Sequence, residues 1–157
     1  MKIIGHLIIF FFLNVTILHS EEIKLTKITE DLKLPWSLSF INQNEALITE
    51  KSGNIIYFNL EKQELKNIKH NLKILEKGQG GLLDILYHNK NVFVSYSENR
   101  GDYESSTSIA KGEFNKNKIN FKNIFRAEPP IGGGYHFGSR LAKITIYLLP
   151  LVKEAKE

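Results

Sequence analysis

The chain of 157 residues contains no cysteine. Disulfide bonds, thiolate metal sites and attachment of a lipid to an N-terminal cysteine are therefore excluded. The five histidines show no pair at the i, i+4 spacing of a helical zinc site. A Gly-x-Ser-x-Gly nucleophile turn and a phosphate-binding glycine loop are missing as well. The usual signatures of zinc hydrolases, serine hydrolases and nucleotide-binding enzymes are thus absent.

Charge of one sign does not dominate either. The chain has 21 Lys and Arg against 17 Asp and Glu, a net charge of +4. The positive residues are mostly lysines spread along the whole chain, which is typical of a solvated surface and not of a nucleic-acid-binding stripe. We therefore expect no nucleic-acid partner.

A hydrophobic run of membrane-spanning length is also missing, but the N-terminus resembles a secretory signal. Lys2 precedes a short apolar run at residues 3–13, and Ser20 supplies a small residue before two glutamates. The run is shorter than the roughly 20 apolar residues that cross a bilayer. We predict that residues 1–20 are a signal peptide and that the protein is periplasmic or secreted, with no stable membrane partner. An uncleaved N-terminal anchor is the alternative.

Sustained helical periodicity is missing before residue 142, whereas short β-rich runs separated by polar turns are abundant. Asn42-Gln43-Asn44 and Asn89-Lys90-Asn91 are typical of such turns. Trp36, the single tryptophan, is expected to anchor the core at the start of a strand. The predicted strands are Ile23–Ile28, Trp36–Ile41, Ala46–Glu50, Ile55–Leu60, Leu82–Tyr87, Val92–Ser97, Ser106–Gly112 and Lys118–Phe125. This spacing predicts an all-β sandwich, barrel or propeller.

A loose internal repeat adds the propeller signature to this pattern. Residues 36–59 and 82–112 each give strand, polar turn, strand, turn and strand. Units of three or four antiparallel strands in roughly 40–45 residues have the length of a propeller blade. The repeat is weak residue by residue, and by itself it does not decide between the three folds.

Two glycine-rich loops carry the side chains best suited to chemistry. In the first, residues 78–81, the amide of Gln79 can donate to and accept from a sugar or alcohol hydroxyl. A glycine-rich hairpin with a solvated glutamine is the alternative interpretation.

The second loop, residues 132–141, contains His136. A neutral imidazole there can take a proton from a substrate hydroxyl while a hydride leaves the same carbon. Arg140 can pair with an anionic cofactor, because a guanidinium forks onto carboxylates. The alternatives are a structural histidine bonded to the backbone and an ordinary ion pair of Arg140 beneath the loop.

Four motifs occur in a specific order and spacing: residues 34–40 (LPWSLSF), 47–50 (LITE), 78–84 (GQGGLLD) and 136–141 (HFGSRL). Over about residues 30–142 the chain resembles the N-terminal part of the soluble glucose/aldose sugar dehydrogenases that depend on pyrroloquinoline quinone (PQQ). Each motif is modest, but the four together are specific.

The resemblance implies a six-bladed β-propeller, of which residues 21–142 would form about two to two and a half blades. It implies PQQ over a central channel, a Ca²⁺ that orients it, an aldose substrate and an external electron acceptor. His136 matches the general base that deprotonates the anomeric hydroxyl while hydride passes from that carbon to the quinone. Gln79 matches a sugar contact, and Tyr135 lies at a position that bears on substrate preference.

The resemblance breaks after Ala142. We expect residues 143–157 to be an aberrant tail, translated out of frame. The remaining cofactor contacts and the Ca²⁺ ligands of the family would lie beyond this point, so no metal ligand is assigned. Two other interpretations stay open: a non-catalytic β-propeller module that binds sugar or protein, and an inactive truncated gene product.

Overall fold

The computed structural model describes residues 23–138, 140–144 and 147–150. The predicted signal peptide lies outside these residues, as do residues 145–146 and 151–157 of the predicted tail. Every regular element in the described ranges is a β-strand, so no helix there is long and apolar enough to cross a membrane.

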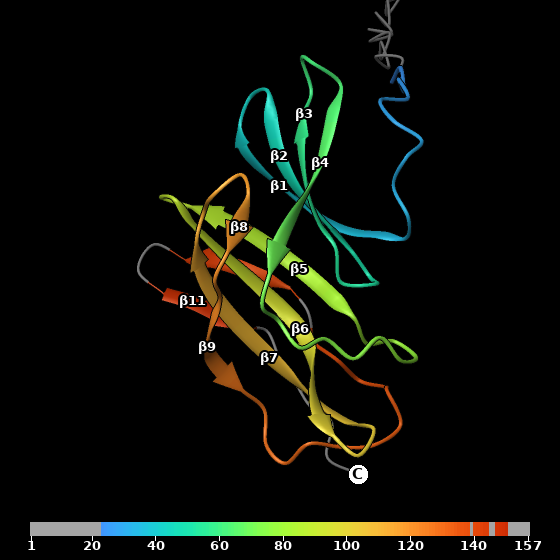
Figure 1. Ribbon diagram of the computed structural model, residues 1–157, viewed down its shortest axis with the longest axis vertical. Coiled ribbons are helices and arrows are strands. Elements are labelled where there is room, and N and C mark those ends of the chain that lie inside the picture. Colours follow the sequence, from blue (N-terminus) through green and yellow to red (C-terminus); the bar gives the residue numbers. More distant parts are fainter. Residues whose placement is uncertain (1–22, 139, 145–146, 151–157) are drawn as a thin grey trace, which may run out of the picture.

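Four antiparallel strands, in their order along the chain, make up most of the first sheet, and a short fifth strand completes it (Figure 1). The four are β1 (Pro35–Asn42), β2 (Glu45–Glu50), β3 (Ile55–Asn59) and β4 (Glu64–His70). The predicted turn between β1 and β2 is closed by the Asn42 side chain, which accepts a hydrogen bond from the backbone N–H of Asn44 at 2.9 Å.

The second sheet has the order β5-β6-β7-β9 and is also antiparallel. Its strands are β5 (Leu82–His88), β6 (Asn91–Gly101), β7 (Glu104–Glu113) and β9 (Lys122–Arg126). Tight turns join the first three, with positive φ at Asn89 and Lys90 and again at Asp102 and Tyr103. Two such residues in a row are the mark of hairpin turns that match the strand twist. The two sheets thus correspond to the two sequence repeats.

A short strand, β8 (Lys118–Ile119), links the sheets. It leaves the second sheet after β7 and pairs in parallel with β4 of the first sheet. Ile119 and Phe121 of this segment are buried between the sheets. The predicted strand Lys118–Phe125 is therefore wrong in one respect: it is two strands that belong to different sheets.

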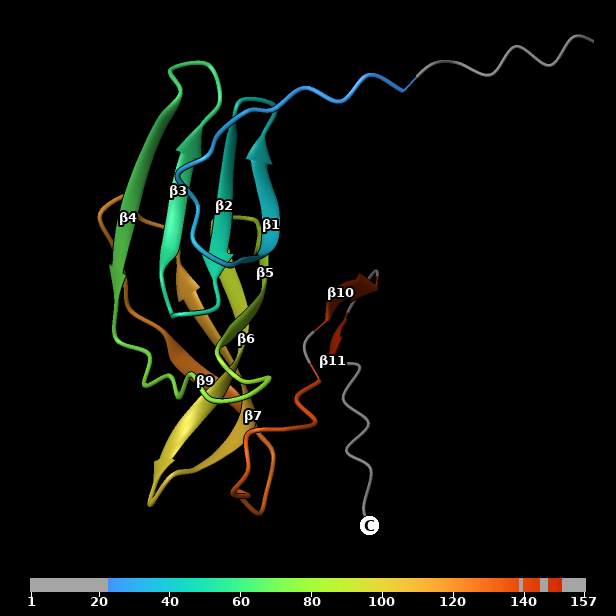
Figure 2. The same ribbon diagram turned by 90° about the vertical axis from the view of Figure 1, so that its right-hand side faces the viewer.

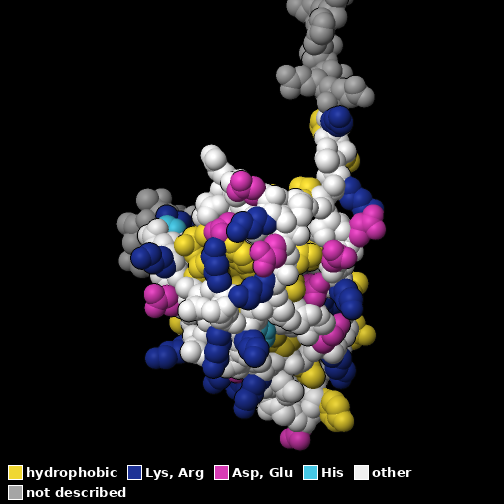
Figure 3. Space-filling view, turned by 45° about the horizontal axis from the view of Figure 1, so that its top comes forward, with side chains coloured by type: hydrophobic (Ala, Val, Ile, Leu, Met, Phe, Trp, Pro, Cys, Tyr) yellow, Lys and Arg dark blue, Asp and Glu magenta, His cyan; other side chains and the backbone are white. Residues whose placement is uncertain are grey.

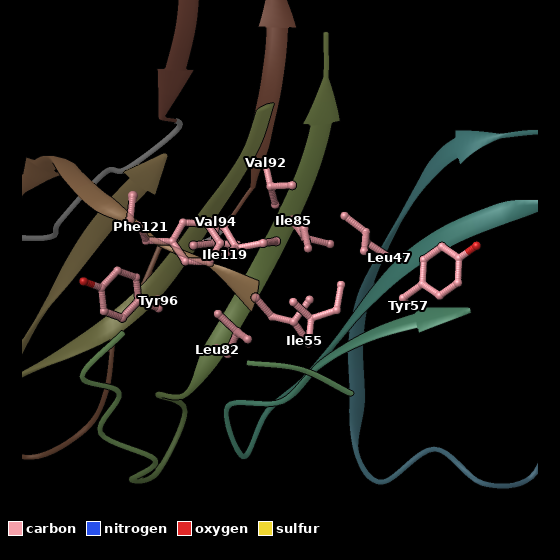
Figure 4. Packing of buried hydrophobic residues seen from close by; sticks show 12 residues of the cluster. Leu47, Ile55, Tyr57, Leu82, Ile85, Val92, Val94, Tyr96, Ile119 and Phe121 are labelled. Carbon is pink, nitrogen blue, oxygen red and sulfur yellow. The ribbon is translucent and has the colours of Figure 1, made fainter. Parts of the chain in front are cut away.

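The core lies between the two sheets (Figure 4). Side chains from alternate positions of facing strands meet there because one face of each strand points inward. Its buried members are Leu47, Ile55, Tyr57, Ile68, Leu82, Ile85, Val92, Val94, Tyr96, Ala110, Ile119 and Phe121.

A third, smaller layer begins on the far face of the second sheet. The hairpin of β10 (Leu141–Ile144) and β11 (Tyr147–Pro150) stands beside that sheet in Figure 2. Leu141 is buried against Phe93 and Ile109 there. Two complete sheets and a hairpin form a partial β-propeller, so the predicted all-β fold class is confirmed.

Two further predictions about single elements are wrong, and one strand is missing from the prediction. Residues Ile23–Ile28 are exposed and form no strand, because no described residue pairs with them or covers their apolar side chains. The strand β4 was not predicted, since Ile68 is its one fully buried residue and the rest reads as polar. Trp36 is not a core anchor in this chain: 46% of it is exposed.

Trp36 belongs to a row of exposed apolar side chains on β1. Ser37 and Ser39 point toward the second sheet, where they bond to Asp84 and to the backbone of Tyr87. The alternate residues face the other way, and Trp36, Leu38 and Phe40 are 46%, 49% and 57% exposed. Trp36 and Leu38 line a groove of about 210 Å³.

Charged side chains of both signs are interspersed over the face seen in Figure 3. Lysines and arginines are more frequent there, but acidic side chains lie among them. This distribution agrees with the ordinary solvated surface expected from the sequence.

Candidate functional site

The two glycine-rich loops lie against each other, although 57 residues separate Gln79 from His136. The backbone N–H of Gln79 donates to the carbonyl of Gly134 at 2.8 Å. A Cβ on Gly78 would lie 2.4 Å from that carbonyl oxygen, and a Cβ on Gly134 would lie 2.7 Å from the carbonyl oxygen of Lys77. Both glycines also have positive φ. The loops can approach this closely only because these positions carry no side chain.

His136 sits on this junction in an unusual backbone conformation. Its φ is +65°, which residues with a Cβ adopt rarely and at some cost in energy. Its backbone N–H donates to Oε1 of Gln79 at 3.1 Å. One acceptor of the glutamine amide is thus used to hold the histidine, while the Nε2 group has no partner among the described residues.

The His136 side chain is exposed. The structure gives its imidazole no hydrogen bond to any described residue, so neither ring nitrogen is engaged by one. The ring of Tyr135 lies beside it, with 6.4 Å between the ring centroids and 56% of the tyrosine exposed. The alternative of a structural histidine needs a bond from the ring to the backbone, and no such bond is found among the described residues.

Arg140 lies farther along the same loop. Its side chain is 75% exposed, and NH1 is 3.8 Å from Oδ1 of Asp84. This distance marks a weak ion pair, which leaves most of the guanidinium free to bind an anion. No contact among the described residues joins Arg140 to His136 or Gln79, so the structure brings together three of the four predicted site residues.

The first loop is anchored by residues that sequence reasoning missed. Lys51 donates from Nζ to the carbonyl of Gly78 at 2.6 Å, and its own carbonyl accepts from the N–H of Leu82 at 3.1 Å. The turn after β2 thereby fixes both ends of the Gln79 loop. A lysine in a polar turn gives no local signal of this contact.

A second polar cluster lies elsewhere, beside a cleft of about 390 Å³. Glu98 is buried there and accepts two hydrogen bonds from Arg126 at 2.7 Å and one from Ser108 at 2.7 Å. Burial raises the pKa of Glu98, but the bonds from Arg126 and Ser108 outweigh it and hold that pKa below its ordinary value. Burial, assisted by the nearby Glu98 charge, raises the pKa of Tyr96 to about 12. This cluster ties β6, β7 and β9 together and does not touch His136.

No group of three or more His, Asp or Glu side chains in the described part of the chain could hold a metal ion. The described residues therefore offer no cluster of carboxylates for the calcium that the family resemblance implies.

Comparison with known proteins places these loops in a family. A family model described as Glucose / Sorbosone dehydrogenase matches residues 32–147. An aldose sugar dehydrogenase of Escherichia coli (strain K12) is 30% identical over 121 residues, which are 71% of this chain and 33% of that protein.

Solved structures of such dehydrogenases resemble this chain as well. The soluble aldose sugar dehydrogenase of Escherichia coli in its apo form matches with a TM-score of 0.68 and 29% identity, over 74% of this chain and 36% of that one. The PQQ-bound aldose sugar dehydrogenase of Streptomyces coelicolor shares the fold, with a TM-score of 0.63 and 18% identity over 74% and 36% of the two chains. The chain thus spans about a third of the length of these relatives. The match to the family model covers most of its residues, and the chain belongs to the glucose/sorbosone dehydrogenase family.

Proposed function

We propose that this chain carries the proton-accepting side of a sugar-oxidising site, in which the C1 hydroxyl of an aldose is oxidised. The observation that carries the proposal is the junction of the two loops. His136 presents a free imidazole there, directly beside the Gln79 amide that holds its backbone. A general base and a hydroxyl-binding amide at one place are two of the parts that oxidation of an aldose uses, and a hydride acceptor is the third.

In this reaction His136 takes the proton of the C1 hydroxyl as a hydride leaves C1, and the cyclic aldose becomes a lactone. The free Nε2 group of Gln79 donates a hydrogen bond to an oxygen of the sugar. Tyr135, exposed beside the imidazole, limits which sugars can approach. PQQ, when bound, supplies the hydride acceptor, and an external acceptor then removes the electrons.

An exposed hydrogen-bond donor of this chain fits the carboxylates that PQQ carries. Among the described residues, Arg140 has a guanidinium that is 75% exposed and one distant acidic neighbour. A carboxylate of PQQ can pair with it bidentately. The PQQ-bound relative from Streptomyces coelicolor supports this cofactor. The described residues hold no cluster of carboxylates for calcium, and no step is assigned to it.

We also propose that residues 1–20 direct the protein to the periplasm or out of the cell. Those residues lie outside the described ones, and the proposal rests on their sequence. Cell fractionation of the expressed chain tests it: an unprocessed protein in the cytosolic fraction would contradict export.

Dye reduction tests the enzymatic proposal. The chain, and a longer version in which the reading frame after residue 142 is restored, are reconstituted with PQQ and Ca²⁺ and given a panel of aldoses. We expect turnover in the longer version and a roughly 10²- to 10⁴-fold loss of kcat in His136→Ala. His88→Ala, which alters a histidine at the end of β5, is the matched control and should retain activity.

The outcomes separate the alternatives. Absence of turnover with every aldose in the longer version, together with sugar binding, would favour the non-catalytic module. Turnover in the longer version alone would make the present chain an inactive truncated product. Full activity of His136→Ala would overturn the assignment of the base.

A further inference from the structure

Asp84 is a buried carboxylate that the proposed reaction does not use. It is 4% exposed and interrupts the apolar run of β5, where an ionised side chain is costly unless it is well bonded. It closes the glycine-rich motif at residues 78–84 but makes no contact with His136 or Gln79 among the described residues. Its bonds lead to other elements.

Each oxygen of this carboxylate reaches a different part of the fold. Oδ2 accepts the backbone N–H of Leu141 at 2.5 Å, at the start of β10. Oδ1 accepts the hydroxyl of Ser37 on β1 and the backbone N–H of Ile85 at 3.0 Å. NH1 of Arg140 lies 3.8 Å from the same oxygen. Asp84 therefore joins both sheets to the point where the His136 loop ends.

The two ends of that loop are held in different ways. The upstream end is fixed by backbone bonds between Ser105 and Ile131 in both directions at 3.0 Å and by the bond from Gln79 to Gly134. At the downstream end the side chain of Asp84 supplies the hydrogen bond of the Leu141 backbone. The Asp84 side chain thus fixes the downstream end of a loop whose central residue, His136, has a strained backbone conformation.

We propose that Asp84 is a positioning residue for the His136 loop. Its carboxylate holds Leu141 and steers the exposed Arg140, and so determines where the imidazole and the guanidinium stand relative to Gln79. The link to ligand binding rests on the proposed function, whereas the effect on the loop does not. A bond from an N–H to a charged acceptor is strong enough that its loss raises local opening roughly tenfold or more.

Hydrogen exchange of single amides in the full chain, followed by NMR, tests the proposal. In Asp84→Ala we expect exchange at Leu141 and His136 to accelerate at least tenfold, while Val94 and Ala110 in the core stay within threefold. Asp84→Asn retains an acceptor and should restore most of the protection, and it serves as the folded variant if alanine is not tolerated. Ser37→Ala removes a bond to the same carboxylate on the side away from the loop and should leave Leu141 within threefold.

Two results would overturn the positioning role. One is unchanged exchange at Leu141 and His136 in Asp84→Ala. The other is an equal acceleration at Val94 and Ala110, which would show that the carboxylate serves only general stability.

Titration of the chain with PQQ tests whether the position of the loop matters to ligand binding. We expect Asp84→Ala to weaken PQQ binding at least tenfold, and unchanged affinity beside a loosened loop would overturn the claim that the position of the loop matters to the ligand. If the unaltered chain binds no PQQ, the proposed function loses its cofactor, and the exchange comparison alone decides the role of Asp84.

Discussion

The buried Glu98 offers the sharpest test of how the second sheet is held together. Its carboxylate accepts bonds from Ser108 and Asn123 at 2.7 and 2.9 Å and two from Arg126 at 2.7 Å. Glu98→Gln keeps the shape but turns one acceptor into an NH₂ group that faces these donors. Bonds to charged groups contribute about 1.5–3 kcal/mol each, and the half-exposed Arg126 recovers part of its loss in water. We expect the free energy of unfolding at pH 7 to fall by about 2 kcal/mol.

The direction of the pKa shift of Glu98 predicts how this loss of stability changes with pH. The pKa of Glu98 is lower in the folded chain than its ordinary value, so the ionised carboxylate stabilises the fold above the unfolded-state pKa of about 4.3. That stabilisation is lost as the pH falls through the folded-state pKa, where the neutral acid resembles glutamine. Urea unfolding of both proteins at pH 7 and near pH 3 should therefore show a difference that closes in acid. An equal or larger difference at the lower pH would refute the reasoning.

Three further predictions follow from other contacts. Gly134→Ala places a Cβ 2.7 Å from the carbonyl oxygen of Lys77 at a φ of +79°, so amide exchange of Gln79 should accelerate at least tenfold; unchanged exchange would contradict the interlocked loops. Phe40→Ser, on the exposed row of β1, should change the free energy of unfolding in urea by less than about 0.5 kcal/mol, and a large loss of stability would contradict its exposure. The Tyr96 phenol should titrate near pH 12 in the ultraviolet difference between the unaltered chain and Tyr96→Phe, and titration near 10 would contradict its burial.

Much of the fold was predictable because its inner strands have the pattern that a pleated sheet imposes. The turn at Asn89 was visible from residue types that accept positive φ. The strand β4 escaped prediction because it buries one residue completely, and an outer strand of this kind carries little periodic signal. The segment Ile23–Ile28 has the composition of a strand, but pairing depends on a neighbour that local sequence does not specify.

The candidate site could likewise be predicted only in part. Gln79 and His136 were each recognisable from residue type and glycine context, whereas their contact across 57 residues is a property of the sheet order. Asp84 was not predicted to have a role, because its link to Leu141 depends on where β10 packs. Lys51 gave no signal, since the bond it makes to Gly78 is set by the turn that follows β2.

The arrangement around His136 depends on the first two sheets and on the start of β10. A non-glycine residue at positive φ costs on the order of 1–2 kcal/mol, and it persists only where neighbouring contacts hold it. These contacts come from Gln79 at the centre, Ser105 upstream and Asp84 downstream, all on the second sheet or the loop that leads into it. Since all of these contacts lie within the described residues, the geometry of His136 and Gln79 is set by this part of the family fold. A cofactor and an electron acceptor would add to this geometry without having to create it.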